Sequence, residues 1–215
     1  MEASFWHKKW ERGEINFHGS EANPLLTKHF EKLSLAKGSR VFLPLCGKTR
    51  DIAWLLANGY RIAGAELSGQ AINDLFKELG VAPNISEVGK LTHYSAADID
   101  IWVGDIFDVS AEDLGPINAI YDRAALVALP ADMRKHYASH LMQITGAAPQ
   151  LLISYEYNQS QIDGPPFSVN EDEVRQHYGA AYQLKSVERK DVAGGLKGKV
   201  ASTENAWLLL QKANR

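Results

Sequence analysis

The sequence of 215 residues has one cysteine, no excess of one charge and no long apolar run. A single cysteine excludes an internal disulfide and a cysteine cluster for zinc. With 23 Lys and Arg against 26 Asp and Glu, the net charge is −3, which disfavours the basic face of a duplex nucleic-acid binder. No apolar run approaches the roughly 20 residues of a membrane helix, and residues 1–10 lack the apolar stretch of a signal peptide. We therefore expect a cytoplasmic protein that binds neither nucleic acid nor membrane.

Short apolar runs alternate with longer amphipathic stretches, a pattern typical of βαβ units on a parallel sheet. We expect one α/β domain with a seven-stranded, mostly parallel Rossmann-like sheet and helices on both faces. Residues 1–37 are predicted to form an N-terminal helical cover, and residues 38–215 the core. The stretch 83–95 is expected to contain loops or a small hairpin. The seven strands are predicted at residues 41–45, 61–66, 99–103, 118–121, 151–155, 182–188 and 205–210.

The turn Leu45-Cys46-Gly47-Lys48 follows the first predicted strand and precedes a helix, so its backbone can approach a nucleoside. Neither the dinucleotide pattern G-x-G-x-x-G nor the phosphate loop G-x-x-x-x-G-K-[ST] is present. The turn is thus poorly suited to a pyrophosphate. Two interpretations stay open at this point, a plain tight turn and a contact for an adenosine-like ligand.

Glu66 ends the second predicted strand, about 20 residues beyond the glycine turn, where an acidic side chain accepts hydrogen bonds from ribose hydroxyls. The alternative is a solvated glutamate at a strand end. Asp105 ends the third predicted strand, where it can reach the base of the ligand, and Ile106 and Phe107 can pack on that base. An adenosine site without a pyrophosphate loop points to S-adenosylmethionine.

Asp122 and Arg123 follow the fourth predicted strand and are expected to face the same crevice. An arginine stays protonated and is no base, but it can bind a carboxylate or stabilise a developing thiolate. A structural Asp–Arg ion pair is the alternative. Trp6 and Trp10 share one helical face. They either pack on the core or cover the crevice, with Trp10 against the sulfonium cation.

Four further signals are weak. Cys46 is interpreted as a small buried structural residue. His136 and His140 do not match a zinc-helix motif, so no metal is predicted. The loop 164–167 is either a stiff structural loop or a wall of the substrate pocket. The glycine-rich segment 194–199 is interpreted as a flexible surface loop, because no helix follows it.

Five features of the sequence belong together. Four are the blocks Arg40–Lys48, Ala63–Ser68, Tyr121–Leu129 and Gly164–Phe167, and the fifth is the spacing of Trp6, Trp10, Phe17 and His18. Together they resemble the thiopurine S-methyltransferase family, and the chain length resembles its bacterial branch. The resemblance implies a class I methyltransferase fold, with S-adenosylmethionine as the cofactor. It also implies methyl transfer to the sulfur of aromatic and heterocyclic thiols such as thiopurines. Bacterial relatives are linked to selenium and tellurium compounds, so a selenol or metalloid substrate is implied as well.

The resemblance also assigns roles residue by residue. Cofactor contacts fall on Trp10, Leu45, Glu66, Asp105, Ile106 and Arg123, and substrate contacts on Phe17 and Pro166. Arg123 is the one candidate for a catalytic role, as a group that favours the thiolate. The rival interpretations are an NAD-dependent oxidoreductase, a nucleic-acid methyltransferase, and a non-catalytic S-adenosylmethionine-binding or metalloid-sequestering resistance protein. Nothing in the sequence demands more than a monomer.

Overall fold

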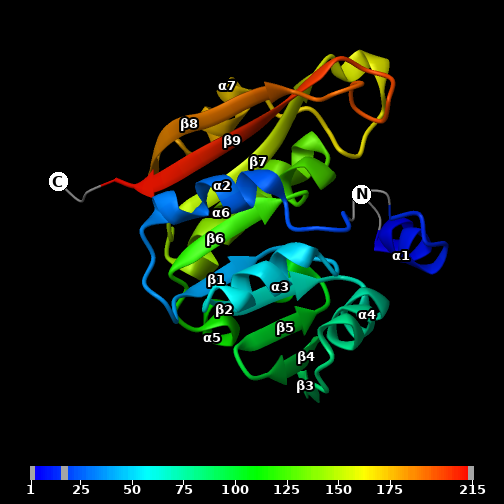
Figure 1. The fold of residues 1–215 in the computed structure, drawn as a ribbon, viewed down its shortest axis with the longest axis vertical. Helices are drawn as coiled ribbons and strands as arrows, with labels where there is room; N and C mark the ends of the chain where they lie inside the picture. The colour runs from blue at the N-terminus through cyan, green and yellow to red at the C-terminus, as the bar shows by residue number, and fades with distance from the viewer. Residues whose placement is uncertain (1–2, 16–18, 213–215) are drawn as a thin grey trace.

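Five parallel strands form the centre of a nine-stranded sheet in the computed structural model, which describes residues 3–15 and 19–212. The strand order is β3-β4-β5-β2-β1-β6-β7-β9-β8. Strands β5, β2, β1, β6 and β7 pair in parallel, while β3-β4 and β9-β8 flank them as antiparallel hairpins (Figure 1). The strands are β1 Arg40–Leu43, β2 Arg61–Glu66, β3 Asn84–Val88, β4 Leu91–Ala96, β5 Ile99–Val103, β6 Ala119–Arg123, β7 Gln150–Tyr157, β8 Tyr182–Asp191 and β9 Ser202–Gln211.

The predicted fold class is confirmed, but the predicted count of seven strands is wrong. The two additional strands are β3 and β4, which form a hairpin inside the stretch expected to hold loops or a small hairpin. All five residues of β3 are exposed. An edge strand that buries neither face has no alternating apolar pattern, so hydrophobic periodicity cannot reveal it.

Helices cover both faces of the sheet, as predicted. On one face, α5, α6 and α7 pack against side chains such as Phe42, Ile120 and Leu152. On the other face, α2, η1, α3 and α4 pack against Val41, Ile62 and their neighbours. The helices are α1 Ala3–Glu11, α2 Pro24–His29, α3 Arg50–Ala57, α4 Gly69–Leu79, α5 Ala111–Leu114, α6 Ala131–Thr145 and α7 Glu171–Tyr178, with 3-10 turns η1 Phe30–Leu33, η2 Ile106–Asp108, η3 Leu126–Ala128 and η4 Gln159–Gln161.

The two helices that follow β1 and β2 begin at polar caps. The Thr49 side chain accepts a hydrogen bond from the backbone amide of Asp51, and the Ser68 side chain accepts one from Ala71. These caps satisfy amides that have no partner inside the helix. They fix the first turns of α3 and α4 at the carboxyl ends of β1 and β2, the edge at which parallel sheets bind ligands.

The N-terminal region divides into two parts. Residues 24–33 bury Leu25, Leu26, Phe30 and Leu33 in the core, whereas α1 buries only Trp10. Helix α1 lies beside the carboxyl ends of the central strands (Figure 1). In the described part of the chain, no helix is long and apolar enough to cross a bilayer.

Candidate active site

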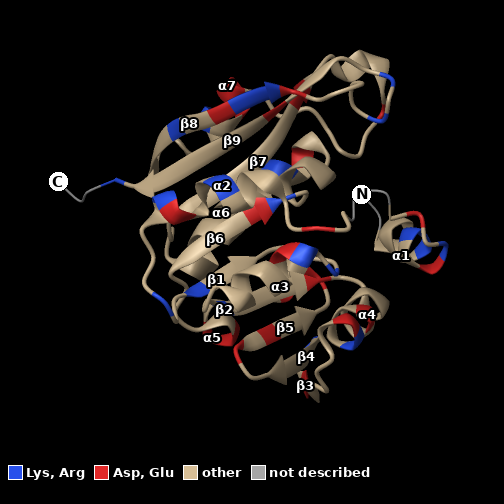
Figure 2. Ribbon diagram, in the orientation of Figure 1, with Lys and Arg blue, Asp and Glu red and all other residues tan. Residues whose placement is uncertain are grey.

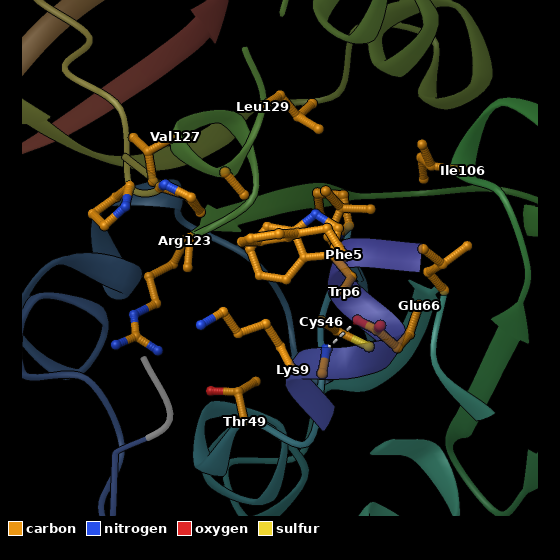
Figure 3. A pocket seen from close by; sticks show the side chains of 18 of the residues that line it. Phe5, Trp6, Lys9, Cys46, Thr49, Glu66, Ile106, Arg123, Val127 and Leu129 are labelled. Atoms are coloured by element: carbon orange, nitrogen blue, oxygen red, sulfur yellow. Dashed lines mark hydrogen bonds between the residues drawn. The ribbon is translucent and has the colours of Figure 1, made fainter. Parts of the chain in front are cut away.

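A cavity of about 1040 Å³ opens at the carboxyl ends of the central strands. Its floor comes from the turns that follow β1, β2, β5 and β6, and α1 lies over it (Figure 3). The loop before α7 and the loop between β8 and β9 complete the wall. The volume stands at the upper end of the range of about 300–1,000 Å³ for small-molecule sites, so a donor and an acceptor can occupy it together.

The turn after β1 has an unusual backbone. Leu45 and Gly47 both have positive φ angles, of 47° and 53°. The backbone amide of Cys46 donates to the carbonyl of Ala65 at 3.0 Å, which joins the turn to β2. A Cβ atom at Gly64 would lie 2.5 Å from Ile101 Cδ1 and 3.1 Å from Cys46 Sγ. Gly64 therefore permits this close approach, a requirement that the sequence analysis did not identify.

Glu66 lies on the floor of the cavity and is only 6% exposed. Its Oε2 accepts from the backbone amide of Gly47 at 2.8 Å (Figure 3). Its Oε1 accepts from the backbone amide of Ser68 at 2.9 Å. Burial raises the pKa of this carboxyl, and backbone amides, including that of Leu67, oppose the rise. A carboxylate has about four lone-pair sites, so each oxygen keeps an acceptor site for an external hydroxyl. Glu66 is thus no solvated strand-end residue.

Trp10 packs directly on the β1 turn. The side chain is 4% exposed, and its Cζ2 lies 3.0 Å from the position of a Cβ atom at Gly47. Trp6 and Trp10 both line the cavity. Because α1 buries little else, the position of this helix favours a cover over the crevice rather than an ordinary core helix.

Asp105 and Ile106 lie at the rim beyond β5, and both line the cavity. The Asp105 carboxylate accepts from the backbone amide of Phe107 at 3.0 Å and caps η2. The Phe107 ring stacks on the His136 ring with centroids 4.3 Å apart. His140 Nε2 forms a hydrogen bond with the Ile106 carbonyl at 2.9 Å. Both histidines thus have structural contacts, and the described residues contain no cluster that could hold a metal ion.

Arg123 and Asp122 point to opposite sides of β6, so the expectation that both face the crevice is wrong. Asp122 is fully buried; it accepts from the Tyr137 hydroxyl at 2.8 Å and from the Leu126 amide at 3.1 Å. Burial raises the pKa of Asp122 to about 6. Arg123 lines the cavity (Figure 3). Within residues 3–15 and 19–212 the Arg123 side chain forms no hydrogen bond and no salt bridge, so the alternative of an Asp–Arg ion pair is also wrong.

Pro166 lies in the wall of the cavity with Gly164 and Pro165. The Tyr157 hydroxyl donates to the Pro166 carbonyl at 2.6 Å, and the Phe167 amide donates to the Val127 carbonyl at 2.6 Å. These bonds fix the loop against β7 and η3. The loop is therefore both a stiff element and a wall of the pocket. Phe17, the other predicted substrate contact, lies outside the described residues.

The loop between β8 and β9 contributes to the site although the sequence analysis interpreted it as a flexible surface loop. Leu196, Lys197 and Lys199 line the cavity. The backbone amide of Leu196 donates to the carbonyl of Val200 at 2.7 Å. A glycine-rich segment with two lysines has no sequence feature that separates this position from a solvated hairpin loop.

The cavity thus combines two kinds of chemistry. At one end, a carboxylate held by two backbone amides lies beside a tryptophan ring, which suits a vicinal diol and a desolvated cation. The same cavity is lined by Arg123, whose side chain has no partner among residues 3–15 and 19–212, and by the proline wall; such an arginine suits an anion.

Comparisons with known proteins show the family to which the chain belongs. The family model "Thiopurine S-methyltransferase (TPMT)" matches residues 1–213. A thiopurine S-methyltransferase from Xanthobacter autotrophicus is 53% identical over 210 residues, which are 97% of this chain and 99% of that protein. One from Teredinibacter turnerae is 53% identical over 214 residues, with all of both chains covered.

Among solved structures, the 1,6-didemethyltoxoflavin-N1-methyltransferase of Burkholderia thailandensis, which holds S-adenosylhomocysteine, matches with a TM-score of 0.65. The match covers 97% of this chain and 87% of the other at 14% identity, so it speaks for the fold alone. The family match spans nearly the whole chain, and the relatives are similar over their full lengths. The chain therefore belongs to the thiopurine S-methyltransferase family, whose enzymes take their methyl group from S-adenosylmethionine.

Proposed function

We propose that this chain methylates the sulfur of aromatic and heterocyclic thiols such as thiopurines, and that selenols and tellurium compounds are further acceptors. The observation that carries the proposal is one cavity that contains both the buried Glu66 carboxylate and Arg123, whose side chain has no partner in the described part of the chain. The cationic donor would bind at the Glu66 end, and the soft nucleophile would bind as an anion near Arg123. Family membership supports the same reaction.

The residues at the carboxylate end fit S-adenosylmethionine. Glu66 keeps acceptor sites for the two ribose hydroxyls, and Asp105 and Ile106 lie where the adenine side of the ligand would reach the rim. Leu45 and Trp10 would flank the sulfur, since Trp10 packs over the turn that contains Leu45. When bound, this donor supplies an electrophilic methyl group on a sulfonium whose positive charge disappears on transfer.

The chain contributes chiefly by alignment and by exclusion of water. Helix α1 covers the crevice, and a partly desolvated anionic nucleophile reacts more readily than a solvated one. Arg123 would hold the acceptor sulfur as a thiolate, because a guanidinium stays protonated and stabilises a neighbouring anion. Pro166 and Phe17 would line the acceptor pocket, Phe17 by family resemblance alone. We assign no general base.

We further propose that residues 1–215 act as one cytoplasmic, monomeric methyltransferase domain, in which the N-terminal region 1–37 contributes the cover through α1, while its residues 24–33 pack in the core. The position of Trp10 on the β1 turn supports this assignment.

A substrate panel tests the proposed function. The purified chain is incubated with S-adenosylmethionine and a thiopurine, an aromatic thiol, a selenol or tellurite. Release of S-adenosylhomocysteine and the mass of the methylated product are measured. We expect a methyl–sulfur product that requires the free thiol. Binding of donor or oxyanion without any product would instead support a non-catalytic sequestering protein.

A further inference from the structure

We infer that Lys197 and Lys199 of the β8–β9 loop, together with Lys9 of α1, form a cationic subsite at the cavity mouth. This subsite binds an anionic group that the thiol substrate carries away from its sulfur. The inference rests on the proposed function, because it specifies the acceptor of the same reaction. The subsite selects thiols with a carboxylate over neutral thiols of the same shape.

The acidic side chains that line the cavity already have partners within the protein. Glu66 accepts from two backbone amides, and Asp105 caps η2. The Asp51 carboxylate accepts from a tyrosine hydroxyl at 3.1 Å. Glu14 forms a salt bridge with Lys9 at 2.5 Å. None of these four carboxylates neutralises a lysine of the β8–β9 loop.

Only some of the basic side chains around the cavity have acidic partners. Lys48 pairs with Glu78 at 2.8 Å, and Lys9 pairs with Glu14. By contrast, the side chains of Lys197 and Lys199 form no hydrogen bond or salt bridge with any residue in the described ranges. If Arg123 serves the thiolate or the donor, these two ammonium groups remain uncompensated at the mouth.

The backbone of the loop holds the two lysines toward the cavity. Leu196 and Val200 pair with each other and are 8% and 4% exposed, and they pack against Tyr157. A Cβ atom at Gly195 would lie 2.5 Å from the Val200 carbonyl oxygen, so the turn closes tightly. Lys197, with a φ of 53°, follows this apolar anchor. Through Tyr157 the anchor connects to the proline wall of the acceptor pocket.

The basic loop and α1 converge on the same side of the molecule (Figures 1 and 2). Lys9 points into the cavity in the direction of Arg123 (Figure 3). The pKa of Lys197 is lowered, first by partial burial and then by the charges of Lys9 and Lys199. The positive charges of Lys9 and Lys199 thus act on Lys197, although Lys9 also pairs with Glu14, and an oxyanion beside Lys197 would offset them.

A pair of matched thiols tests the subsite. 4-Mercaptobenzoate and 4-mercaptobenzamide share shape and thiol position but differ in charge. We expect the wild-type chain to favour the carboxylate in kcat/KM, mainly through KM. Because an exposed ion pair contributes about 0.2–1 kcal/mol, equal to a factor of about 1.4–5, Lys197→Gln or Lys199→Gln should each lower the preference by that factor. The double variant should lower it by about 2- to 25-fold if the two free energies add, and added salt should reduce the wild-type preference.

The control is Lys185→Gln, which removes an exposed lysine of β8 outside the cavity and should leave the preference unchanged. Binding of benzoate and benzamide, measured by calorimetry, provides a readout independent of turnover. An unchanged preference for the carboxylate in the double variant would overturn the inference. So would weaker S-adenosylmethionine binding by Lys197→Gln, since the lysines would then serve the donor. If neither thiol is methylated but benzoate binding still depends on the lysines, the proposed function fails and the subsite stands.

Discussion

Substitution of Glu66 tests whether one carboxylate both shapes the β1 turn and holds the donor. Glu66→Gln keeps the volume of the side chain but replaces one acceptor oxygen with an amide group. That group would face the backbone amide of either Gly47 or Ser68, now at 2.8 and 2.9 Å from the carboxylate. Hydrogen bonds to charged groups contribute about 1.5–3 kcal/mol. We expect donor affinity to fall by about 1–3 kcal/mol, equal to about 5- to 150-fold in Kd.

Glu66→Ala should weaken donor binding at least as strongly and should also lower thermal stability. It leaves two buried backbone amides without an acceptor, each with a desolvation cost of about 1–3 kcal/mol. Calorimetric titration with S-adenosylmethionine gives the affinity, and thermal unfolding separates binding from stability. Glu87→Gln is the matched control, because Glu87 is an exposed residue of β3 outside the cavity.

Unchanged donor affinity in a Glu66→Gln variant that melts at the wild-type temperature would refute the reasoning. The carboxylate would then be only a brace for the turn, and the ribose would bind elsewhere.

Three further substitutions test other parts of the site. Arg123→Met should lower kcat/KM for a thiol about tenfold, because the thiolate loses a counter-ion worth about 1.4 kcal/mol. The pH profile of kcat/KM should also move to higher pH. The profile of the Arg61→Met control should match that of the wild type. Gly47→Ala should impair donor binding and shift tryptophan fluorescence, because its Cβ would lie 3.0 Å from Trp10 Cζ2. Gly80→Ala is the control, since Gly80 also has a positive φ, of 70° against 53° for Gly47, but its Cβ would have no neighbour within 4 Å. Equal effects of both substitutions would disprove the contact. Asp122→Asn should remove a pH dependence of stability. The Asp122 carboxyl has a pKa of about 6 in the folded protein and an ordinary value of 3.8. The wild type therefore loses on the order of 3 kcal/mol of unfolding free energy as pH rises from 4 to 6. Urea unfolding of wild type and variant at pH 4 and 7 measures this difference, and parallel pH profiles would contradict it.

Sequence patterns could predict the parts of this fold in which apolar burial fixes the structure. The five central strands are short apolar runs because both of their faces are covered, and Ser68 and Gly80 delimit α4 as the capping preferences predict. Glu66 and Gly47 could be paired from their spacing alone, since a strand end and a preceding turn meet at one edge of a parallel sheet.

The remaining features depend on contacts between segments far apart in the chain. Asp122 and Arg123 are neighbours in β6, so their side chains point to opposite faces of the sheet. The sequence alone does not show which of the two faces the cavity. Strand β3 has no buried face and β4 buries only Leu91 and Tyr94, so the composition of this hairpin resembles that of a loop. Lys197 reaches the cavity only because Leu196 and Val200 anchor the loop on Tyr157, and no local pattern contains that information.

The two halves of the cavity come from different parts of the chain. The donor half is made by the ends of strands whose residues also form the hydrophobic core, so most changes there would disturb folding. The acceptor half includes the hairpin loop of residues 192–201, which touches the core through only a small apolar cluster. With the proposed assignment of these halves, relatives that share one methyl donor can diverge in the acceptors they methylate by exchanging a short surface segment.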